Sequence, residues 1–316
     1  MNLRSKYLVR MGMPTSKLTF AVLVGATVIA SAGCRMNVDS QAFIEREEKR
    51  FPATSLVDLN VSTFDGSVEI RSWDRAEVLV EVEKRGQDKD AVSKISVTSD
   101  QKGNQITVDA NHAGRTVMIG IGRFTSPSAR LIVSVPRKCN ITARTGDGSI
   151  TLDRVEGKLD LRSGDGSIKV IEGKGDVLVE SGDGSVTLDD VSGHVEARTS
   201  DGSVRVSGTP GALRVRTGDG SVTLRIRDGA AMTDDWMIDT GDGSVTAELP
   251  SGFNAMIEAD PGSDGRVRSD FMLSNATGAN ITGRSREKGP VSGQLGTGGK
   301  RLTLRTGDGT IRITNY

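Results

Sequence analysis

Residues 144–247 repeat one five-residue phrase: TGDGS at Thr145, SGDGS at Ser163 and Ser181, TSDGS at Thr199, and TGDGS at Thr217 and Thr240. The Asp of the first five phrases stands at positions 147, 165, 183, 201 and 219, a constant 18-residue spacing, and the sixth, at position 242, follows a longer interval. A fixed period of this size indicates a repeat architecture, because so small a unit cannot bury a core alone and must stack on its neighbours.

Each repeat contains two short strands, because apolar residues alternate with charged or hydroxyl residues on both sides of the phrase. Around the Asp of the third phrase, Val186 and Leu188 follow it and Val177 and Val179 precede it, each pair with one residue between. This period of two is typical of half-buried strands. A second turn, such as Ser192-Gly193, separates the two strands.

Two strands and two turns in each 18-residue unit allow two folds. One is a β-solenoid whose equivalent strands stack in parallel about 4.8 Å apart, and the other is an antiparallel meander. Identical turns that recur in register favour the solenoid. We therefore predict an all-β, parallel β-helix-like solenoid of 18-residue two-strand coils, most regular at residues 144–249, with a less regular β-rich N-terminal part.

Residues 1–33 have the order of a targeting segment. A basic region is followed by an apolar run at residues 18–30, which is too short for a comfortable transmembrane helix, and then by Ser31-Ala32-Gly33-Cys34. This ending resembles the bacterial lipobox, whose cysteine is diacylated and becomes the new N-terminus. We predict that residues 1–33 are a lipoprotein signal peptide and that Cys34 is lipidated; an ordinary secretory signal peptide and an uncleaved anchor are the alternatives.

The rest of the chain is predicted to consist of a tether and one domain. Residues 34–52 are polar and include the run EREEKR at residues 45–50, so they are expected to form a charged tether, in which Ser40 could cap a short helix. Residues 53–316 are expected to form a single β-strand-repeat domain. Residues 228–235 are an insertion and residues 271–299 a longer interruption, after which the pattern resumes.

Four longer phrases resemble the bacterial putative-adhesin family of β-strand-repeat proteins. They are VDLNVSTFDGSVEI at residues 57–70, RLIVSVPRKCNITARTGDGSITL at 130–152, GSVTAELPSGFNAMIEA at 243–259 and LTLRTGDGTIRI at 302–313. The resemblance covers residues 51–316 and implies a repeated strand–turn–strand fold in a protein that is secreted, lipid-anchored or membrane-tethered. It implies no catalytic residue, and its members are largely of unknown function.

The Asp-Gly-Ser turn is the obvious candidate site. We expect its Gly to turn the chain in the left-handed region, and its Asp and Ser side chains to bond nearby backbone N–H groups. Stacked carboxylates about 4.8 Å apart repel each other, so either such donors or bound cations must compensate. Calcium-binding RTX solenoids have an Asp turn every nine residues or so, whereas the opposite turns here lack the matching Asp. The structural role is therefore predicted, and weak calcium sites are the alternative at Asp147, Asp165, Asp183, Asp201 and Asp219.

Other chemistry has few candidate residues. The only His residues are His112 and His194, Cys139 is the only Cys besides Cys34, and no spacing resembles a zinc site, a disulfide framework or a Ser-His-Asp elbow. Sugar-binding sites typically contain aromatic side chains on which sugar rings stack, and the coils contain few aromatic residues besides Trp236. Outward-facing charged residues are expected to line one face of the coils: Asp153, Asp189, Glu248, Arg162, Arg198 and Arg216.

We therefore predict a non-enzymatic, lipid-anchored cell-envelope protein that presents a rigid β-repeat scaffold for adhesion or for binding protein or glycan, without a cofactor. The alternatives are an envelope polysaccharide-acting enzyme of the parallel β-helix type and an envelope-stress signalling component. Without residues 1–33 the chain has 37 basic and 41 acidic residues, which is not the balance of a nucleic-acid-binding protein. Arg35 follows Cys34 where Asp would indicate inner-membrane retention, so the outer membrane or cell surface is favoured.

Overall fold

The computed structural model describes residues 42–113, 126–275, 280–281 and 289–316. Residues 40–316 form one compact unit, and the description below concerns that unit. The predicted signal peptide and Cys34 lie outside the described residues, as do residues 114–125. Within the described ranges, no helix has the length and apolar character needed to cross a membrane.

The described part of the unit is built from strands and one short helix. The N-terminal elements are β1 (Phe43–Pro52), β2 (Val57–Thr63), β3 (Val68–Trp73), β4 (Glu77–Gly86), α1 (Lys89–Ser93), β5 (Ile95–Lys102), β6 (Gln105–His112) and β7 (Ser128–Pro136). The repeat elements are β8 (Cys139–Thr145), β9 (Ile150–Asp153), β10 (Glu156–Ser163), β11 (Ile168–Ile171), β12 (Lys174–Ser181), β13 (Val186–Thr199), β14 (Val204–Thr217), β15 (Val222–Ile226), β16 (Trp236–Thr240) and β17 (Val245–Leu249). The C-terminal elements are β18 (Ala255–Asp260), β19 (Arg266–Ser269), β20 (Leu273–Asn275), β21 (Asn280–Ile281), β22 (Val291–Leu295), β23 (Arg301–Thr306) and β24 (Thr310–Asn315).

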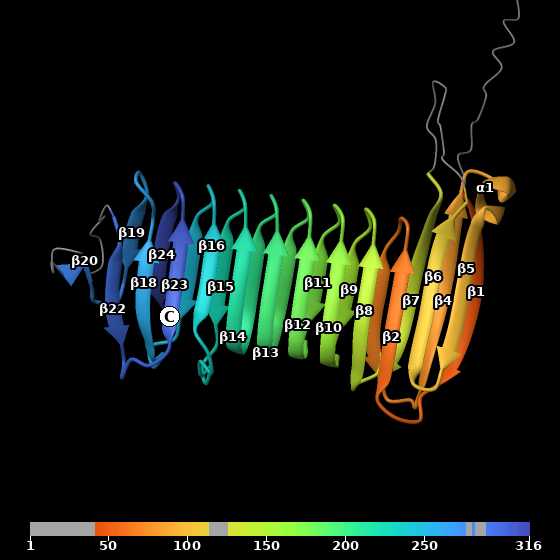
Figure 1. Ribbon diagram of the computed structural model, residues 1–316, viewed down its shortest axis with the longest axis horizontal. Coiled ribbons are helices and arrows are strands. Elements are labelled where there is room, and N and C mark those ends of the chain that lie inside the picture. Colours follow the sequence, from red (N-terminus) through yellow and green to blue (C-terminus); the bar gives the residue numbers. More distant parts are fainter. Residues whose placement is uncertain (1–41, 114–125, 276–279, 282–288) are drawn as a thin grey trace, which may run out of the picture. The chain divides into compact units, whose positions relative to one another are not determined.

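The strands form two arrays, which we call the first and second sheets (Figure 1). The first sheet has the order β5-β6-β2-β8-β10-β12-β13-β14-β16-β23-β18-β22. The second has the order β1-β4-β7-β3-β9-β11-β13-β14-β15-β17-β24-β19. The long strands β13 and β14 contribute to both. The repeat strands β8 to β17 pair with one another in parallel, as predicted, and antiparallel pairs occur near the two ends of the stack.

The pairing register keeps the 18-residue period only in the middle of the unit. Leu159 lies between Ile141 and Val177, and Val186 lies between Ile168 and Val204, so each partner occupies the same place in the adjacent repeat. Beyond β15 the offset grows, because Val222 pairs with Val245 across the predicted insertion. The departure beyond β15 coincides with the predicted insertion at residues 228–235, and a regular 18-residue coil stays a prediction.

The core lies between the two sheets and is formed by the predicted alternation. Val177, Val179, Val186 and Leu188 are all buried, while the residues between them reach the outer faces. Each column of inward side chains repeats from coil to coil, so aliphatic groups stack in rows along the whole unit. Stacking buries a core that a single coil could not enclose.

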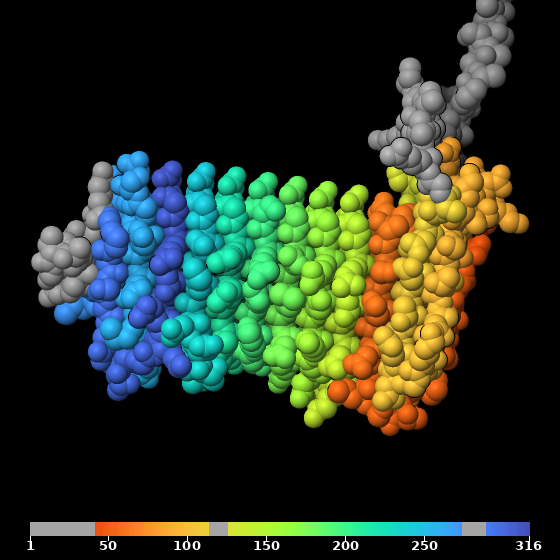
Figure 2. Space-filling model, in the orientation of Figure 1, coloured from red at the N-terminus to blue at the C-terminus, as the bar shows by residue number. Residues whose placement is uncertain are grey.

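Chain order and spatial order differ at both ends of the stack. β2, from the first coil of the chain, lies between β6 and β8. β23, from the last coil, lies between β16 and β18. Figure 2 shows both insertions as ridges out of colour order: orange between gold and yellow-green, and dark blue between cyan and light blue. The first and last coils of the chain are therefore held by neighbours on both sides.

Residues 43–52 form strand β1 rather than the predicted charged tether or a short helix. β1 pairs with β4 antiparallel along its whole length. Its alternation lets Glu45 and Glu47 contact Lys84, whose ammonium group is 3.6 Å from Glu45 and also pairs with Glu47. Lys84 is buried, and a buried cation needs such partners. Charged edge strands also resist unwanted pairing with other chains.

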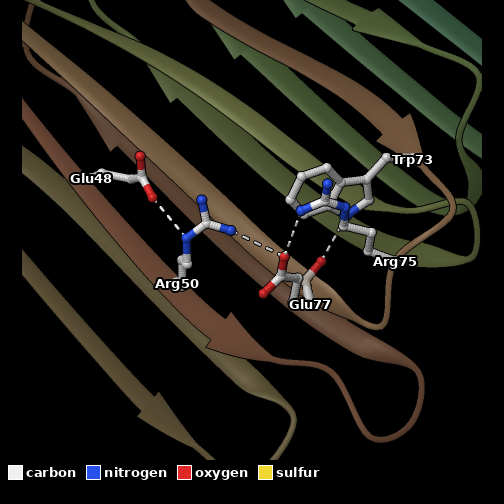
Figure 3. A network of polar contacts seen from close by, with 5 residues as sticks. All are labelled: Glu48, Arg50, Trp73, Arg75 and Glu77. Atoms are coloured by element: carbon white, nitrogen blue, oxygen red, sulfur yellow. Dashed lines mark hydrogen bonds and ion pairs between the residues drawn. The ribbon is translucent and has the colours of Figure 1, made fainter.

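A second polar network holds the end of β1 (Figure 3). Arg50 bonds Glu48 at 2.7 Å and Glu77 at 3.1 Å, and Arg75 reaches the same Glu77 carboxylate at 3.5 Å. The indole N–H of Trp73 donates to the Glu77 carbonyl at 2.8 Å. These contacts join β1 to the turn between β3 and β4.

Candidate functional site

The turn between the two strands of each coil is held by the buried hydroxyl that stands two residues before the Asp of the turn. Ser163 donates to the Gly148 carbonyl of the preceding coil at 2.8 Å and accepts from the Gly166 N–H at 3.0 Å. Equivalent bonds to the preceding coil are made by Thr145 to Gly66, Ser181 to Gly166, Thr199 to Gly184, Thr217 to Gly202, Thr240 to Gly220 and Thr306 to Gly243. A column of hydroxyl groups therefore links turn to turn.

The glycine after each repeat Asp is required by close stacking. A Cβ at Gly184 would lie 2.3 Å from the Gly166 carbonyl oxygen, and one at Gly202 would lie 2.1 Å from that of Gly184. Neither residue has a positive φ. The expectation that these glycines turn the chain in the left-handed region was wrong. Left-handed residues occur instead in the opposite turns, where Arg154, Glu172 and Asp190 have φ of 51–56°.

The repeat carboxylates point to solvent. Asp147, Asp165, Asp183, Asp201 and Asp219 are exposed. Across the part of the chain that the structure describes, no hydrogen bond reaches these five carboxylates, in contrast to the predicted bonds from backbone N–H groups. No three His, Cys, Asp or Glu side chains are grouped as for a metal ion in those ranges. Weak calcium binding by these five carboxylates stays the untested alternative.

One aspartate of the turns is partly buried. Burial raises the pKa of Asp65, and the neighbouring Asp147 carboxylate raises it further. Asp65 belongs to the β2–β3 turn, which stacks on the first repeat turn. Repulsion between stacked turns, expected from the sequence, therefore acts at this step.

The residues that could have supported enzyme chemistry are placed apart. Cys139 is buried at the start of β8, where burial and then the charge of Asp58 raise the pKa of its thiol to about 12. His194 is exposed on the first sheet. Trp236 is only 1 % exposed, and its N–H donates to the Gly211 carbonyl at 3.0 Å. Trp236 is thus a core residue and offers no sugar platform.

The charged residues expected on one face belong to two faces. Asp153, Asp189 and Glu248 lie on the second sheet, whereas Arg162, Arg198 and Arg216 lie on the first. The prediction was wrong because both strands of a coil alternate in the same way, and the pattern does not say which strands share a sheet. On the first sheet, Arg162 pairs with Asp160 at 2.8 Å and Glu180 at 2.9 Å.

The strongest candidate for a binding site is a groove on the outer face of the second sheet, over β11, β13, β14, β15 and β17. Its volume is about 670 Å³. The lining includes four cationic side chains, Lys169, Arg205, Arg225 and Arg227, together with hydroxyl groups and the carboxylates of Asp189 and Glu248. We call this feature the basic groove.

The carboxylates of the basic groove are already engaged. Arg227 pairs with Asp190 at 2.8 Å and lies 3.9 Å from Asp189. Arg225 lies 3.7 Å from Glu248. Lys169 and Arg205, in contrast, make no ion pair with any residue that the structure describes. The groove therefore offers two uncompensated cations.

Residues 57–314 match the Toastrack DUF4097 family. The chain belongs to this family. The resemblance to a family of β-strand-repeat proteins that the four phrases indicated is thereby confirmed, as is an all-β, solenoid-like architecture. A comparison with curated proteins finds no match.

The Toastrack domain is also similar to solved structures. One is described as a "putative cell adhesion protein" from Clostridium sporogenes, with 12% identity, 87% of this chain and 100% of that chain covered, and a TM-score of 0.31. A "putative adhesin" from Bacteroides fragilis has 12% identity, coverage of 85% and 97%, and a TM-score of 0.40. A "putative adhesin" from Parabacteroides distasonis has 10% identity, coverage of 85% and 97%, and a TM-score of 0.36. Such distant likeness transfers no function to this Toastrack chain.

The sequence carries a signal for the basic groove of the Toastrack domain. The residue four positions after each repeat Asp points outward, and in chain order these residues include Thr151, Lys169, Thr187, Arg205 and Thr223. They alternate between hydroxyl and cation without a carboxylate. Only the pairing of the strands places them side by side.

Proposed function

We propose that this protein is a non-enzymatic, lipid-anchored protein of the cell envelope, whose β-repeat stack presents outward side chains for adhesion or for binding protein or glycan. The repeating unit of that scaffold is proposed to be the 18-residue two-strand coil. The observation that carries the proposal is the in-register stacking of equivalent strands, for example Lys169 between Thr151 and Thr187. Stacking turns a sequence repeat into a row of side chains, so weak contacts can add along one partner.

Two further features support binding over catalysis. The basic groove is open and its acids are paired with arginines, whereas a hydrolase of acidic type needs a carboxylate pair with separated pKa values. The buried thiol of Cys139, with its raised pKa, is a poor nucleophile. A packed stack also suits a scaffold, because its surface rows hold fixed spacings.

The proposed anchor is a lipid on Cys34, with the outer membrane or the cell surface as its site. The support is the basic region, the apolar run and the small residues before Cys34, together with Arg35 after it. Mass spectrometry of the mature N-terminus tests this part. We expect an N-terminal diacylated Cys34 in the wild type and loss of membrane attachment in Cys34→Ser. An unmodified mature chain that begins elsewhere would contradict the anchor.

The binding role is tested by capture from envelope fractions. The purified full-length chain is immobilised and incubated with protein and glycan fractions of the cell envelope. A specifically retained fraction, displaced by soluble protein, is the expected result. Turnover of an envelope polysaccharide by the wild type would contradict the non-enzymatic role.

A further inference from the structure

We propose that the basic groove binds a linear anionic polysaccharide, with Lys169 and Arg205 as its main cationic contacts. This inference rests on the proposed binding function and specifies the class of partner. It is carried by a column of hydroxyl and cationic residues on the second sheet, by the unpaired state of the two cations and by the hydroxyl groups between them.

The outward columns of the second sheet differ in charge, and one of them mixes both signs, since Arg225 lies beside Glu248. Another outward column contains only hydroxyl and cationic residues across eight neighbouring strands, in the order Thr151, Lys169, Thr187, Arg205, Thr223, Thr246, Arg312 and Arg268. We call it the cationic column. On the first sheet, the corresponding rows mix both signs, as where Arg162 lies beside Glu180 and Arg216 beside Asp239. The cationic column therefore carries no carboxylate from Thr151 to Arg268, and it ends at β3, where Glu69 lies beside Thr151.

Lys169 and Arg205 are exposed and stand two strands apart, with Thr187 between them. Two strand spacings are about 9.6 Å. The local carboxylates of Asp190 and Glu248 are engaged by Arg227 and Arg225, and Ser207 donates to Asp189 at 2.6 Å. Lys169 and Arg205 could thus bind an anion without first breaking an ion pair within the protein.

The hydroxyl groups favour a sugar polymer. Thr187, Thr223 and Ser207 line the same groove as the cations, and hydroxyls both donate and accept hydrogen bonds, as sugar hydroxyls do. Tyr316 borders the groove, because Arg225 lies over its ring at 5.3 Å, and it is 48% exposed. A chain with regularly spaced carboxylate, sulfate or phosphate groups could therefore follow the column, gaining from repeated weak contacts.

Other polyanions fit less well. Proteins that bind single-stranded nucleic acid stack its bases on aromatic side chains beside the cations. In the described ranges, Tyr316 is the one large exposed aromatic residue at the groove, which is too few for such stacking. Binding to a membrane surface requires an apolar patch, yet the exposed Phe43 and Ile44 lie in β1, at the edge of the second sheet, and the exposed Met272 precedes β20. The groove itself is lined mainly by residues with charged or hydroxyl side chains.

The test measures binding of the purified full-length protein to immobilised polygalacturonate, with dextran sulfate as a second anionic glycan and neutral dextran as the uncharged control. The groove variant is Lys169→Gln with Arg205→Gln. The matched variant is Arg144→Gln with Arg214→Gln, which removes the same charge from exposed positions on the first sheet. Neither pair lies in the core, and melting curves verify that both variants fold.

We expect wild type to bind an anionic glycan and not neutral dextran. The groove variant should bind about tenfold more weakly, and the matched variant should change by about twofold or less. Binding should weaken with added salt, because exposed charge contacts are screened. Polygalacturonate and dextran sulfate distinguish carboxylate from sulfate recognition.

Equal losses in the two variants would overturn the proposal, because they would show a response to net charge alone. Absence of binding to both anionic glycans would overturn it as well. Stronger, groove-dependent binding to a DNA oligonucleotide or to anionic vesicles would replace the glycan with that partner. If the groove variant still captures the envelope fraction, the proposed function stands and the groove is not its site.

Discussion

The hydroxyl of Thr217 donates a 2.9 Å hydrogen bond to the carbonyl of Gly202, which belongs to the turn of the preceding coil. The same bond recurs at successive turns, with Ser in the place of Thr at residues 163 and 181. Because the donor is buried and the acceptor belongs to a neighbouring coil, the bond joins coils rather than closing its own turn.

Thr217→Val should destabilise the protein by about 1–3 kcal/mol, since it keeps the shape of the side chain and leaves a buried carbonyl without its donor. Thr217→Ser keeps the donor and should cost about 1 kcal/mol or less, the scale of one buried methyl. Urea melts of both variants give the comparison. Equal stability of the Val and Ser variants would show that the hydroxyl column contributes nothing.

Gly184→Ala should cost at least about 2 kcal/mol, because its Cβ would overlap the Gly166 carbonyl oxygen and force the coils apart. Gly252→Ala is the matched control, since a Cβ there meets nothing within 4 Å and the backbone φ is not positive. The control should change the unfolding free energy by less than about 1 kcal/mol. A tolerated Gly184→Ala would contradict close stacking of the turns.

Val186→Asp should cost several kcal/mol, because Val186 is fully buried between Ile168 and Val204 and the new carboxylate would have no partner. Thr187→Asp changes the next residue, which lines the basic groove between Lys169 and Arg205, and should cost well under about 1 kcal/mol. Denaturant melts compare the two. Comparable losses would mean that the inward and outward positions are misassigned.

Cys139 should resist thiol reagents in the native protein. Burial raises the pKa of its thiol to about 12, and the thiolate is the reactive form, whereas an exposed thiol titrates near about 8.5. Native labelling should stay slow across neutral and mildly alkaline pH and become fast in guanidinium chloride. Rapid native labelling that follows an ordinary thiol titration would be incompatible with a buried Cys139.

The raised pKa of Cys139 also makes the stability of the protein depend on pH. Between about pH 8.5 and about pH 12 the folded state keeps the Cys139 proton, whereas the unfolded chain releases it. The unfolding free energy should therefore fall as the pH rises through this range. Cys139→Ser should reduce this slope. Denaturant melts at several alkaline pH values provide the readout.

Millimolar calcium should raise the melting temperature of the wild type only slightly, because a ligand stabilises in proportion to its occupancy of the folded state. Asp183→Asn should be mild, since Asp183 is exposed and Asn keeps the turn chemistry. Melts with and without calcium on both proteins separate the structural role from a calcium site. A calcium shift above about 10 °C that shrinks in the variant would establish calcium at the turns.

The repeat sequence alone was sufficient to predict the inward columns and the parallel stacking. Alternation is a local property, so Val186 and Leu188 could be assigned to the core from their neighbours in the chain. The 18-residue period likewise placed equivalent turns in register. The basic groove could be predicted only in part. The alternation places Lys169 and Arg205 on the outer face, but it does not show that the two residues lie in one groove.

Tertiary structure alone decided which strands neighbour which. Because all coils share one pattern, that pattern does not reveal that β2 inserts between β6 and β8, or that β23 inserts between β16 and β18. Likewise, residues 43–52 read as a solvated tether until β4 supplies Lys84 as the partner of Glu47. Alternation acts between residues two apart, whereas strand order depends on pairing between segments far apart in the chain, and a repeated sequence offers many near-equivalent pairings of that kind.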